Sequence, residues 1–240
     1  MAYEACEAAT ALLLRKYGKA LFRKAASPAS RLSALGKIAS LLPTCTLRSA
    51  ESEIFQQFST PIPLGAGSAE LSRHYGGRSR ALLEPSAGTG PSSPRTPAAP
   101  LVLNELAECR AMLLSSIFPA NFVTRFDAAQ VDDHLHPVAP SVVLMNPPFS
   151  AMANISGRMA DTTYRHIASG VARLADGGRL VTISRANFSP EASAAWPDAF
   201  VRLQQRGRVV FTAAITGAIY AKHGTTTETR LTVIDKVAGR

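Results

Sequence analysis

The chain has 240 residues, 46% of them hydrophobic and 18% charged, which is the composition of a soluble globular protein with one well-packed domain. Its 26 basic and 17 acidic side chains give a net charge of +9, and this excess favours a polyanionic partner such as nucleic acid. The sequence excludes a membrane helix, since no run approaches roughly 18 apolar residues, and its 3 widely spaced cysteines speak against a disulfide framework or a zinc site and favour the reducing cytoplasm.

Residues 1–50 are predicted to form a helical extension ahead of a single domain over residues 51–240. Residues 2–24 contain strong helix formers with an apolar stripe, and a second helix is expected over residues 28–42. The start of the chain carries acids and has no basic region before an apolar core, so a secretion signal is not expected. The cations in the second half of the first helix fit either a solvent-exposed surface or contacts with phosphates.

The next elements lead into a glycine-rich turn. Residues 53–63 are predicted to form a short helix ending in a proline-stiffened loop, and residues 65–75 a further helix. An apolar run at residues 81–83 predicts a buried strand, and the turn Glu-Pro-Ser-Ala-Gly-Thr-Gly follows over residues 84–90. The turn lacks the Gly-Lys-Ser/Thr of a phosphate-binding loop and the third glycine of a dinucleotide fingerprint. An acid beside such a turn suits a ligand with cationic groups and a nucleoside.

Strands and helices alternate through the rest of the chain. Strands are predicted at residues 101–103, 121–124, 141–145, 179–184, 209–211 and 230–234, and helices at residues 106–117, 162–175 and 196–205. Residues 150–161 are small and polar and are expected to form a loop over the site. This alternation predicts an α/β fold with a doubly wound, mostly parallel sheet that closes on a hairpin-like pair of strands.

Asn146 follows the strand predicted at residues 141–145 and precedes Pro147, Pro148 and Phe149. Two consecutive prolines end the strand and fix a rigid, extended turn. In open α/β sheets the carboxyl ends of parallel strands are where ligands bind. Taken alone, the tetrapeptide is better explained as a proline-rich loop after a core strand, in which Asn146 caps a nearby group.

Together, the Glu-Pro-Ser-Ala-Gly-Thr-Gly turn and the Asn-Pro-Pro-Phe loop resemble the motifs of class I S-adenosylmethionine-dependent methyltransferases of the amino-methylating DNA type. More narrowly, the chain is similar to the methylase part of bacterial methylase–helicase proteins of the strawberry notch type. The resemblance implies a seven-stranded Rossmann-like methyltransferase sheet and S-adenosyl-L-methionine as the cofactor. It further implies methyl transfer to the exocyclic amine of a nucleic-acid base, above all adenine in DNA, with a separate helicase or specificity subunit as a candidate partner.

The resemblance also assigns roles to the loop after the fourth strand. The implied catalytic residues are Asn146, Pro147, Pro148 and Phe149. The side-chain oxygen of Asn146 and the carbonyl of Pro147 would each accept a hydrogen of the amine, which stabilises the positive charge that develops on its nitrogen. Phe149 would stack on the base.

The implied cofactor-binding residues come from several segments of the chain: Phe58, Thr60, Glu84, Ser86, Gly88, Gly90, Glu105 and Asp127. Phe58 and Thr60 would lie across the methionine end of the cofactor. Glu105 would accept hydrogen bonds from the ribose hydroxyls and Asp127 from the amino group of the cofactor's adenine. From the residues alone, Glu105 also fits an acid in the first turn of a helix, and Asp127 fits a helix N-cap.

Two other functions remain open. The same loop serves any planar amine or amide, so the substrate could be an RNA base or a protein glutamine. The chain could also be a non-catalytic remnant of a methylase–helicase protein, because residues 91–100 contain 4 prolines where the resembled family begins a helix facing the cofactor. No metal is expected, since His134 and His136 lack further ligands at a fitting spacing and are predicted to be loop residues.

Overall fold

The computed structural model of the chain describes residues 2–25, 27–45, 58–73, 81–90, 100–135, 137–148, 156–189, 191–192 and 196–237. Phe149, His136 and residues 91–99 of the proline-rich segment lie outside this part of the chain, as do residues 46–57, 74–80 and 150–155.

Within the described residues, 7 strands form one sheet in the order β3-β2-β1-β4-β5-β7-β6. The strands are β1 (Leu82–Glu84), β2 (Leu101–Asn104), β3 (Val123–Thr124), β4 (Val142–Met145), β5 (Arg179–Arg185), β6 (Gly207–Ile215) and β7 (Thr229–Lys236). Neighbours from β3 through β5 are parallel, whereas β7 is antiparallel to both β5 and β6. The direction of strand order reverses between β1 and β4, which is where such sheets bind ligands. The predicted doubly wound, seven-stranded sheet is confirmed.

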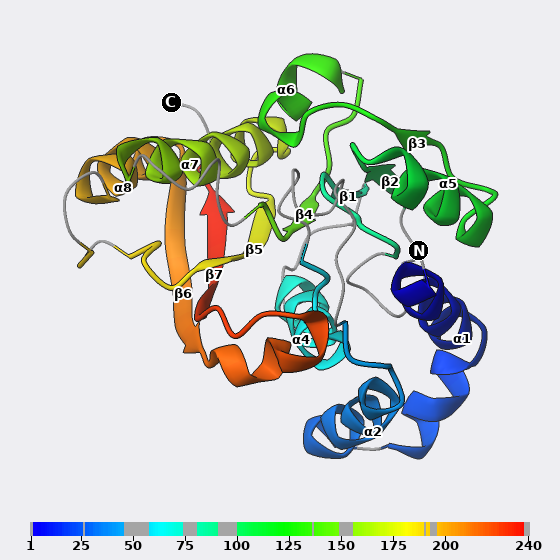
Figure 1. Ribbon diagram of the computed structural model, residues 1–240. Coiled ribbons are helices and arrows are strands. Elements are labelled where there is room, and N and C mark those ends of the chain that lie inside the picture. The colour runs from blue at the N-terminus through cyan, green and yellow to red at the C-terminus, as the bar shows by residue number, and fades with distance from the viewer. Residues whose placement is uncertain are drawn as a thin grey trace.

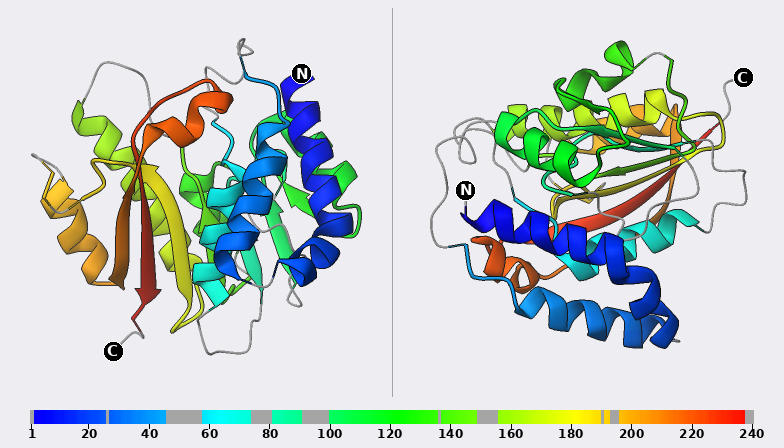
Figure 2. Two further views of the ribbon diagram at one scale, coloured as in Figure 1. Left: turned by 90° about the horizontal axis from the view of Figure 1, so that it is seen from below. Right: turned by 90° about the vertical axis from the view of Figure 1, so that its right-hand side faces the viewer.

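Helices cover both faces of this sheet. One face carries α6 (Val131–His134), α7 (Ser156–Arg173) and α8 (Trp196–Gln204), and the other carries α4 (Ile62–Arg73), α5 (Glu108–Ile117) and the 3-10 helix η2 (Gly217–His223). Figure 1 shows α7 and α8 on the opposite side of the sheet from α4 and η2. At the amino terminus, α1 (Ala2–Lys24) and α2 (Pro28–Ser40) form a helical hairpin that lies against α5 and α4 (Figure 2).

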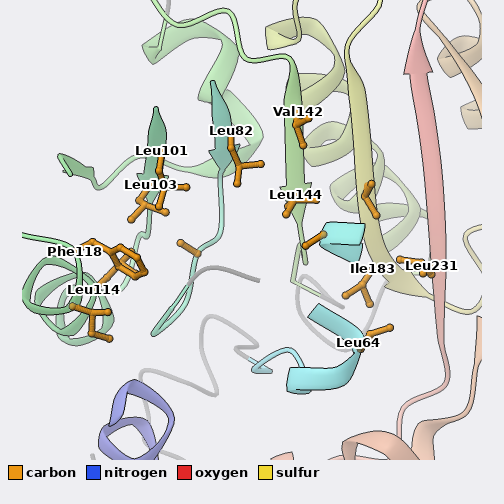
Figure 3. Close-up of a cluster of buried hydrophobic side chains, with 14 of the residues drawn as sticks. Leu64, Leu82, Leu101, Leu103, Leu114, Phe118, Val142, Leu144, Ile183 and Leu231 are labelled. Atoms are coloured by element: carbon orange, nitrogen blue, oxygen red, sulfur yellow. The ribbon is translucent and has the colours of Figure 1, made fainter. Parts of the chain in front are cut away.

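Alternation of side chains along the strands produces two separate hydrophobic cores. Leu82 and Leu144 belong to the core beneath α4 and α5 (Figure 3), whereas Leu83 and Val143 belong to the core shared with α7. Leu83 and Val143 are fully buried at 0% exposure, as expected for central parallel strands that are covered on both faces.

Three elements extend beyond their predicted bounds by at least three residues at one end. Helix α4 begins at Ile62, because Pro63 lies in the first turn, where its missing N–H is not needed. Helix α7 begins at Ser156, so the predicted loop at residues 150–161 is wrong from that residue onward: a small and polar composition does not by itself exclude a helix. Strand β6 has 9 residues because it pairs with β7 along its whole length, from Gly207 to Ile215, and such long-range pairing leaves no local signal.

In the described ranges no helix is long and apolar enough to cross a membrane. The same residues contain no grouping of His, Cys, Asp and Glu side chains that could hold a metal ion. His134 ends α6 instead of lying in a loop, and its ring stacks on Phe126 with the ring centroids 4.3 Å apart.

Candidate functional site

The glycine turn after β1 is fixed by hydrogen bonds to the end of β2. Gly88 has a φ of 62°, a left-handed conformation that favours glycine. Its N–H donates to Oε2 of Glu105 at 2.8 Å, and the N–H of Ala87 donates to the carbonyl of Asn104 at 3.0 Å. The backbone of the turn therefore has one defined course at the carboxyl edge of the sheet.

Helix α1 packs directly on this turn. A Cβ atom added to Gly90 would lie 2.6 Å from the Cβ of Ala11, which is closer than carbon atoms approach without strain. Glycine at position 90 is thus needed for the close approach of α1, and not only for the course of the turn itself.

Asn104 joins the ends of three strands and was not singled out from the sequence. Its side chain is fully buried and makes four hydrogen bonds: Nδ2 donates to the carbonyls of Pro85 and Phe126 at 2.8 and 2.9 Å, and Oδ1 accepts from the hydroxyl of Thr124 and the N–H of Phe126, both at 2.8 Å. These bonds use all the capacity of the amide. They hold the glycine turn in a fixed position relative to the segment that carries Asp127.

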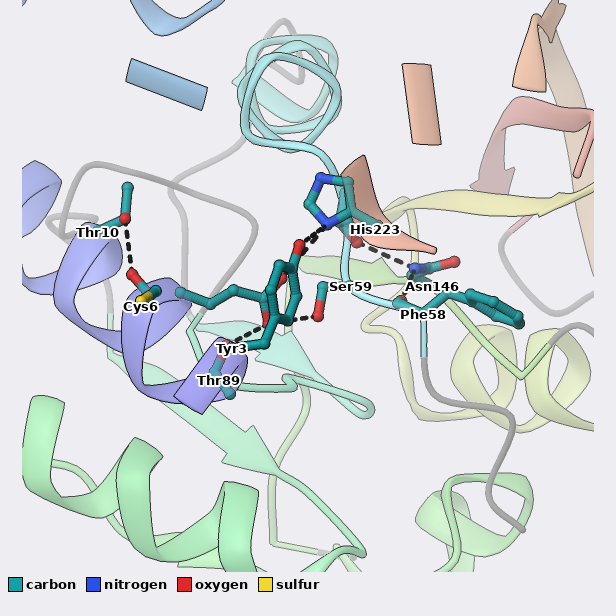
Figure 4. Close-up of polar contacts among 10 residues, drawn as sticks. Tyr3, Cys6, Thr10, Phe58, Ser59, Thr89, Asn146 and His223 are labelled. Carbon is teal, nitrogen blue, oxygen red and sulfur yellow. Dashed lines mark hydrogen bonds and ion pairs between the residues drawn. The ribbon is translucent and has the colours of Figure 1, made fainter. Parts of the chain in front are cut away.

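Asn146 is held in one orientation at the end of β4. Its Nδ2 donates to the carbonyl of Phe58 and to Oγ1 of Thr60, both at 3.1 Å (Figure 4). Because a backbone carbonyl can only accept, the amide nitrogen must face Phe58, and this fixes the assignment of the side-chain oxygen and nitrogen. The Oδ1 atom is buried and has no hydrogen-bond partner among the described residues. A buried acceptor without a partner is uncommon and points to a donor supplied by a ligand.

Glu105 and Asp127 follow β2 and β3 and differ in their surroundings. Glu105 is 6% exposed, and its carboxylate accepts the N–H groups of Gly88 and, at 3.0 Å, of Ala107, which orient it. Asp127 is exposed, and its Oδ1 accepts the N–H of Ala129 at 2.9 Å. Asp127 is therefore the N-cap of the 3-10 helix η1 (Ala128–Gln130), which is the structural role that its sequence position also allowed.

A single cavity joins these elements, with about 1500 Å³ of atom-free space when its open mouth is included. The predicted site residues that line it are Phe58, Thr60, Ser86, Gly88, Gly90, Glu105, Asp127, Asn146, Pro147 and Pro148. The two motifs, which are about sixty residues apart in the chain, thus meet at one rim of the sheet. Phe149 lies outside the described residues.

Glu84 is the predicted site residue that does not line the cavity. It is the last residue of β1 and is 1% exposed. Side chains alternate along a strand, so Glu84 points to the same face of the sheet as Leu82 rather than outward from the strand end. The contact between its carboxylate and the cofactor stays a prediction, and the acid that lines the cavity beside the turn is Glu7 of α1.

Glu7 belongs to a buried polar network that the sequence did not reveal (Figure 4). Its Oε2 accepts hydrogen bonds from the hydroxyls of Ser59 at 2.6 Å and Thr89 at 3.4 Å, and its Oε1 lies 3.3 Å from Nδ1 of His223. The hydroxyl of Tyr3 lies 2.7 Å from the same Nδ1 atom, and burial followed by the charge of Glu7 raises the pKa of Tyr3, so the phenol keeps its proton. The network connects α1, the glycine turn and η2 with residues 58–61, the segment before α4 that is called the strap below.

Two further side chains in the cavity wall, Arg110 of α5 and His166 of α7, were also not predicted as site residues. His166 is 6% exposed, and its Nδ1 has no hydrogen-bond partner among the described residues. Burial lowers the pKa of His166 below its ordinary value of 6.5, and the charge of Asp127 opposes this shift only in part. The imidazole is therefore neutral at pH 7, and the segment bearing Asp127 lies close enough to influence it.

No protein-family model and no curated protein matches this chain. Solved structures share its fold. The methyltransferase subunit of a type I restriction-modification system from Streptococcus thermophilus is 16% identical, with a TM-score of 0.62 over 87% of this chain. A protein assigned as a class I S-adenosylmethionine-dependent methyltransferase from Listeria monocytogenes is 10% identical, with a TM-score of 0.59 over 90% of this chain and 70% of its own.

A third structure, assigned as an RNA methyltransferase from Pyrococcus horikoshii, is 13% identical, with a TM-score of 0.57 over 87% of this chain and 100% of its own. By contrast, the chain spans about half of the restriction-modification subunit, 48% of its length. These likenesses establish a Rossmann-like methyltransferase fold for the chain.

Proposed function

We propose that this chain is an S-adenosylmethionine-dependent methyltransferase that methylates the exocyclic amine of a nucleic-acid base, with adenine in DNA as the first substrate to test. One observation carries the proposal. Asn146 is oriented by two hydrogen bonds through its amide nitrogen, and its oxygen is buried without a partner in the cavity that also contains the glycine turn. The shared fold with methyltransferases supports the same conclusion.

The residues of the cavity fit the cofactor. When bound, S-adenosylmethionine supplies an electrophilic methyl group carried on a sulfonium. Thr60 and Phe58 would hold its methionine end, and the oriented carboxylate of Glu105 would accept hydrogen bonds from the ribose hydroxyls. Asp127 would accept a hydrogen bond from the adenine amino group, and the glycine turn, with Ser86, Gly88 and Gly90, would allow close approach of the backbone.

In the proposed reaction the protein activates the base amine and aligns it with the methyl group. An exocyclic base amine is a poor nucleophile because its lone pair is delocalised into the ring. Oδ1 of Asn146 and the carbonyl of Pro147 would each accept one amine hydrogen, which draws the nitrogen toward a tetrahedral form and stabilises its developing positive charge. No strong general base is needed, because a proton can leave after transfer. The remaining contribution is alignment of the amine with the methyl group.

The rest of the loop would hold the base. Pro148 lines the cavity and keeps the backbone rigid after Asn146. In this proposal Phe149 stacks on the base, a contact worth about 1–3 kcal/mol in nucleic-acid systems. A base in duplex DNA would first have to rotate out of the stack.

Net charge supports a nucleic-acid substrate. The chain carries +9, and residues 8–50 contain no Asp or Glu, so the excess is concentrated in the proposed N-terminal extension, residues 1–50, of a methyltransferase domain at 51–240. Helix α1 of that segment forms one wall of the cavity. The similarity to a restriction-modification subunit and the resemblance to strawberry-notch methylase–helicase proteins support a separate specificity subunit or helicase as partner.

An RNA base is the second candidate substrate. The structure assigned as an RNA methyltransferase is matched over its whole length, whereas the restriction-modification subunit is matched over 48% of its own. The fold shared with that structure supports RNA as a substrate class, and the loop chemistry at Asn146 is the same for both nucleic acids.

Transfer of a labelled methyl group tests the proposal and separates its alternatives. The purified chain is incubated with labelled S-adenosylmethionine and, in parallel, with adenine-containing DNA, RNA and a protein fraction. We expect label in DNA as N6-methyladenine. Label only in RNA would replace the substrate, label only in protein would indicate a glutamine methyltransferase, and failure to bind the cofactor at all would indicate a non-catalytic remnant.

A further inference from the structure

Arg110 is a buried cation in the wall of the cavity. It lies in the first turn of α5, is 7% exposed and faces the glycine turn: a Cβ added to Gly88 would lie 3.9 Å from its Nη1 atom. The side chain therefore lies against the glycine turn in the lining of the cavity, and not on the outer surface of the helix.

No ion pair and no hydrogen bond of Arg110 is found within the described ranges, and its Nε atom is buried without a partner. The Nε atoms of Arg173 and Arg185 are also buried without a partner, but Arg173 donates through Nη1 to the carbonyl of Asp132, and Arg185 is less buried than Arg110. Several other arginines in the described ranges are paired. Arg179, for example, makes a bidentate pair with Asp235 at 2.7 and 2.9 Å, and Arg15, which also lines the cavity, donates to the carbonyl of Ile117. A guanidinium held in a protein interior without an anion is strongly disfavoured, and such groups are normally paired. The charge of Glu4 acts on Arg110, but no ion pair joins the two within the described ranges, so the guanidinium can still pair with an anion that arrives with a ligand.

The surroundings of Arg110 identify the part of the cavity that it serves. The charge of Arg110 acts on Tyr3 of α1, whose hydroxyl lies 2.7 Å from His223. Glu7, one turn further along α1, accepts the hydroxyl of Ser59 in the strap that also carries Thr60. The strap is the segment proposed to hold the methionine end of the cofactor. One buried cation and one buried carboxylate therefore line the part of the cavity next to α1, which matches the opposite charges of an α-amino acid.

We propose that Arg110 binds the carboxylate of the methionine part of S-adenosylmethionine. This inference rests on the proposed function, because it takes that cofactor as the occupant of the cavity. The carboxylate is the cofactor's single anionic group, and a planar guanidinium recognises it through two parallel hydrogen bonds. A backbone phosphate of the nucleic-acid substrate is the other available anion, but at 7% exposure Arg110 lies too deep for a polymer backbone to reach.

Decarboxylated S-adenosylmethionine is the probe that isolates this contact, since it keeps the sulfonium, the ammonium and the nucleoside. Binding of both compounds to the full chain is measured by isothermal titration. The wild-type protein should bind S-adenosylmethionine roughly 10- to 100-fold more tightly than the decarboxylated compound, the range expected for a hydrogen-bonded charge pair. Arg110→Met, which removes the charge at similar volume, should lose affinity for S-adenosylmethionine alone and make the two affinities equal.

Two further variants complete the experiment. Arg110→Lys keeps the charge without the forked donors and should retain part of the preference, which keeps the test decisive if the Met variant does not fold. Arg125→Met is the matched control, because Arg125 is a half-exposed arginine paired with Glu108 of the same helix α5 and lies outside the cavity lining. It should leave both affinities unchanged. The melting temperature of ligand-free Arg110→Met should be no lower than that of the wild type, since no native partner of the charge is lost.

The possible outcomes separate this inference from the proposed function. A wild-type protein that binds both compounds equally would overturn the role of Arg110 while leaving cofactor binding intact. An Arg110→Met variant that loses the same factor for both compounds, or that melts well below the wild type when free, would show a structural role instead. A wild-type protein that binds neither compound would overturn the proposed function itself.

Discussion

Replacing Gly90 by alanine tests how closely α1 packs on the glycine turn. The added Cβ would lie 2.6 Å from the Cβ of Ala11, about 1 Å inside the separation of roughly 3.5–4.0 Å at which two carbon atoms attract. Because the opposing atom is fixed to a helix, either α1 or the turn must shift. Such overpacking costs about 1–3 kcal/mol, and the reduced entropy of the unfolded chain offsets about 0.4–1 kcal/mol of it. We therefore expect a net loss of about 1–2 kcal/mol in the free energy of unfolding.

Ala11→Gly provides the compensating change. Alone it should destabilise the protein by about 1 kcal/mol, because glycine is a poor helix former. Combined with Gly90→Ala it should remove the unfavourable contact. A double-mutant cycle in urea denaturation should then give a favourable coupling of about 1–2 kcal/mol between the two positions. A Gly90→Ala variant as stable as the wild type, or single effects that simply add, would refute the packing of α1 on the turn.

Three more outcomes are expected from the polar groups of the site. Glu7→Gln should lower the free energy of unfolding in urea by about 1–3 kcal/mol, because the buried partners of the carboxylate keep only part of their hydrogen bonds; an unchanged stability would contradict the network. Thr60→Val should slow methyl transfer about 2- to 10-fold by removing one of the two acceptors that orient Asn146, and an unaltered rate would show that Phe58 suffices. The pKa of His166 lies below its ordinary value of 6.5. The contribution of this residue to the free energy of unfolding is therefore fully present above pH 6.5. It is lost as the pH drops through 6.5 toward the lowered pKa, because the unfolded chain takes up the proton first. His166→Leu should therefore lose less stability than the wild type between about pH 7.5 and 5.5, by at most about 1.4 kcal/mol per pH unit; equal losses would contradict the buried, neutral imidazole.

The elements that could be predicted from the sequence are those with a local signal. An apolar run ending at a glycine turn, and another ending at two prolines, located β1 and β4 and their loops, because chain-breaking residues stop a strand where they occur. The parallel order of the sheet followed from the alternation of strands with helices. The loop residues Asn146 and Pro147 then lay at the expected edge, since the carboxyl ends of neighbouring parallel strands meet there.

The other residues of the cavity depend on contacts between distant segments. Glu7 meets Thr89 across 82 positions of sequence, and an acid in a helix of strong formers gives no local signal of burial. An arginine in a helix is normally exposed to solvent. Arg110 is buried because α5 packs against α1, and this contact leaves no signal in the sequence of the helix. The position of Glu84, by contrast, has a local signal. The alternation of side chains along β1 already directs it to one face of the sheet, and that argument was available from the strand alone.

The most direct test of the proposed mechanism is the rate of labelled methyl transfer to adenine-containing DNA by Asn146→Ala, measured beside the affinity of the same variant for S-adenosylmethionine. If Oδ1 of Asn146 accepts a hydrogen of the substrate amine, transfer should fall by at least roughly 100-fold, the effect of removing one preorganised polar group at a developing charge. Cofactor affinity should stay within about threefold of the wild type, because Asn146 would contact the substrate rather than the cofactor. A variant that keeps more than about a tenth of the wild-type rate, or that loses transfer only in proportion to cofactor binding, would contradict this role of Asn146.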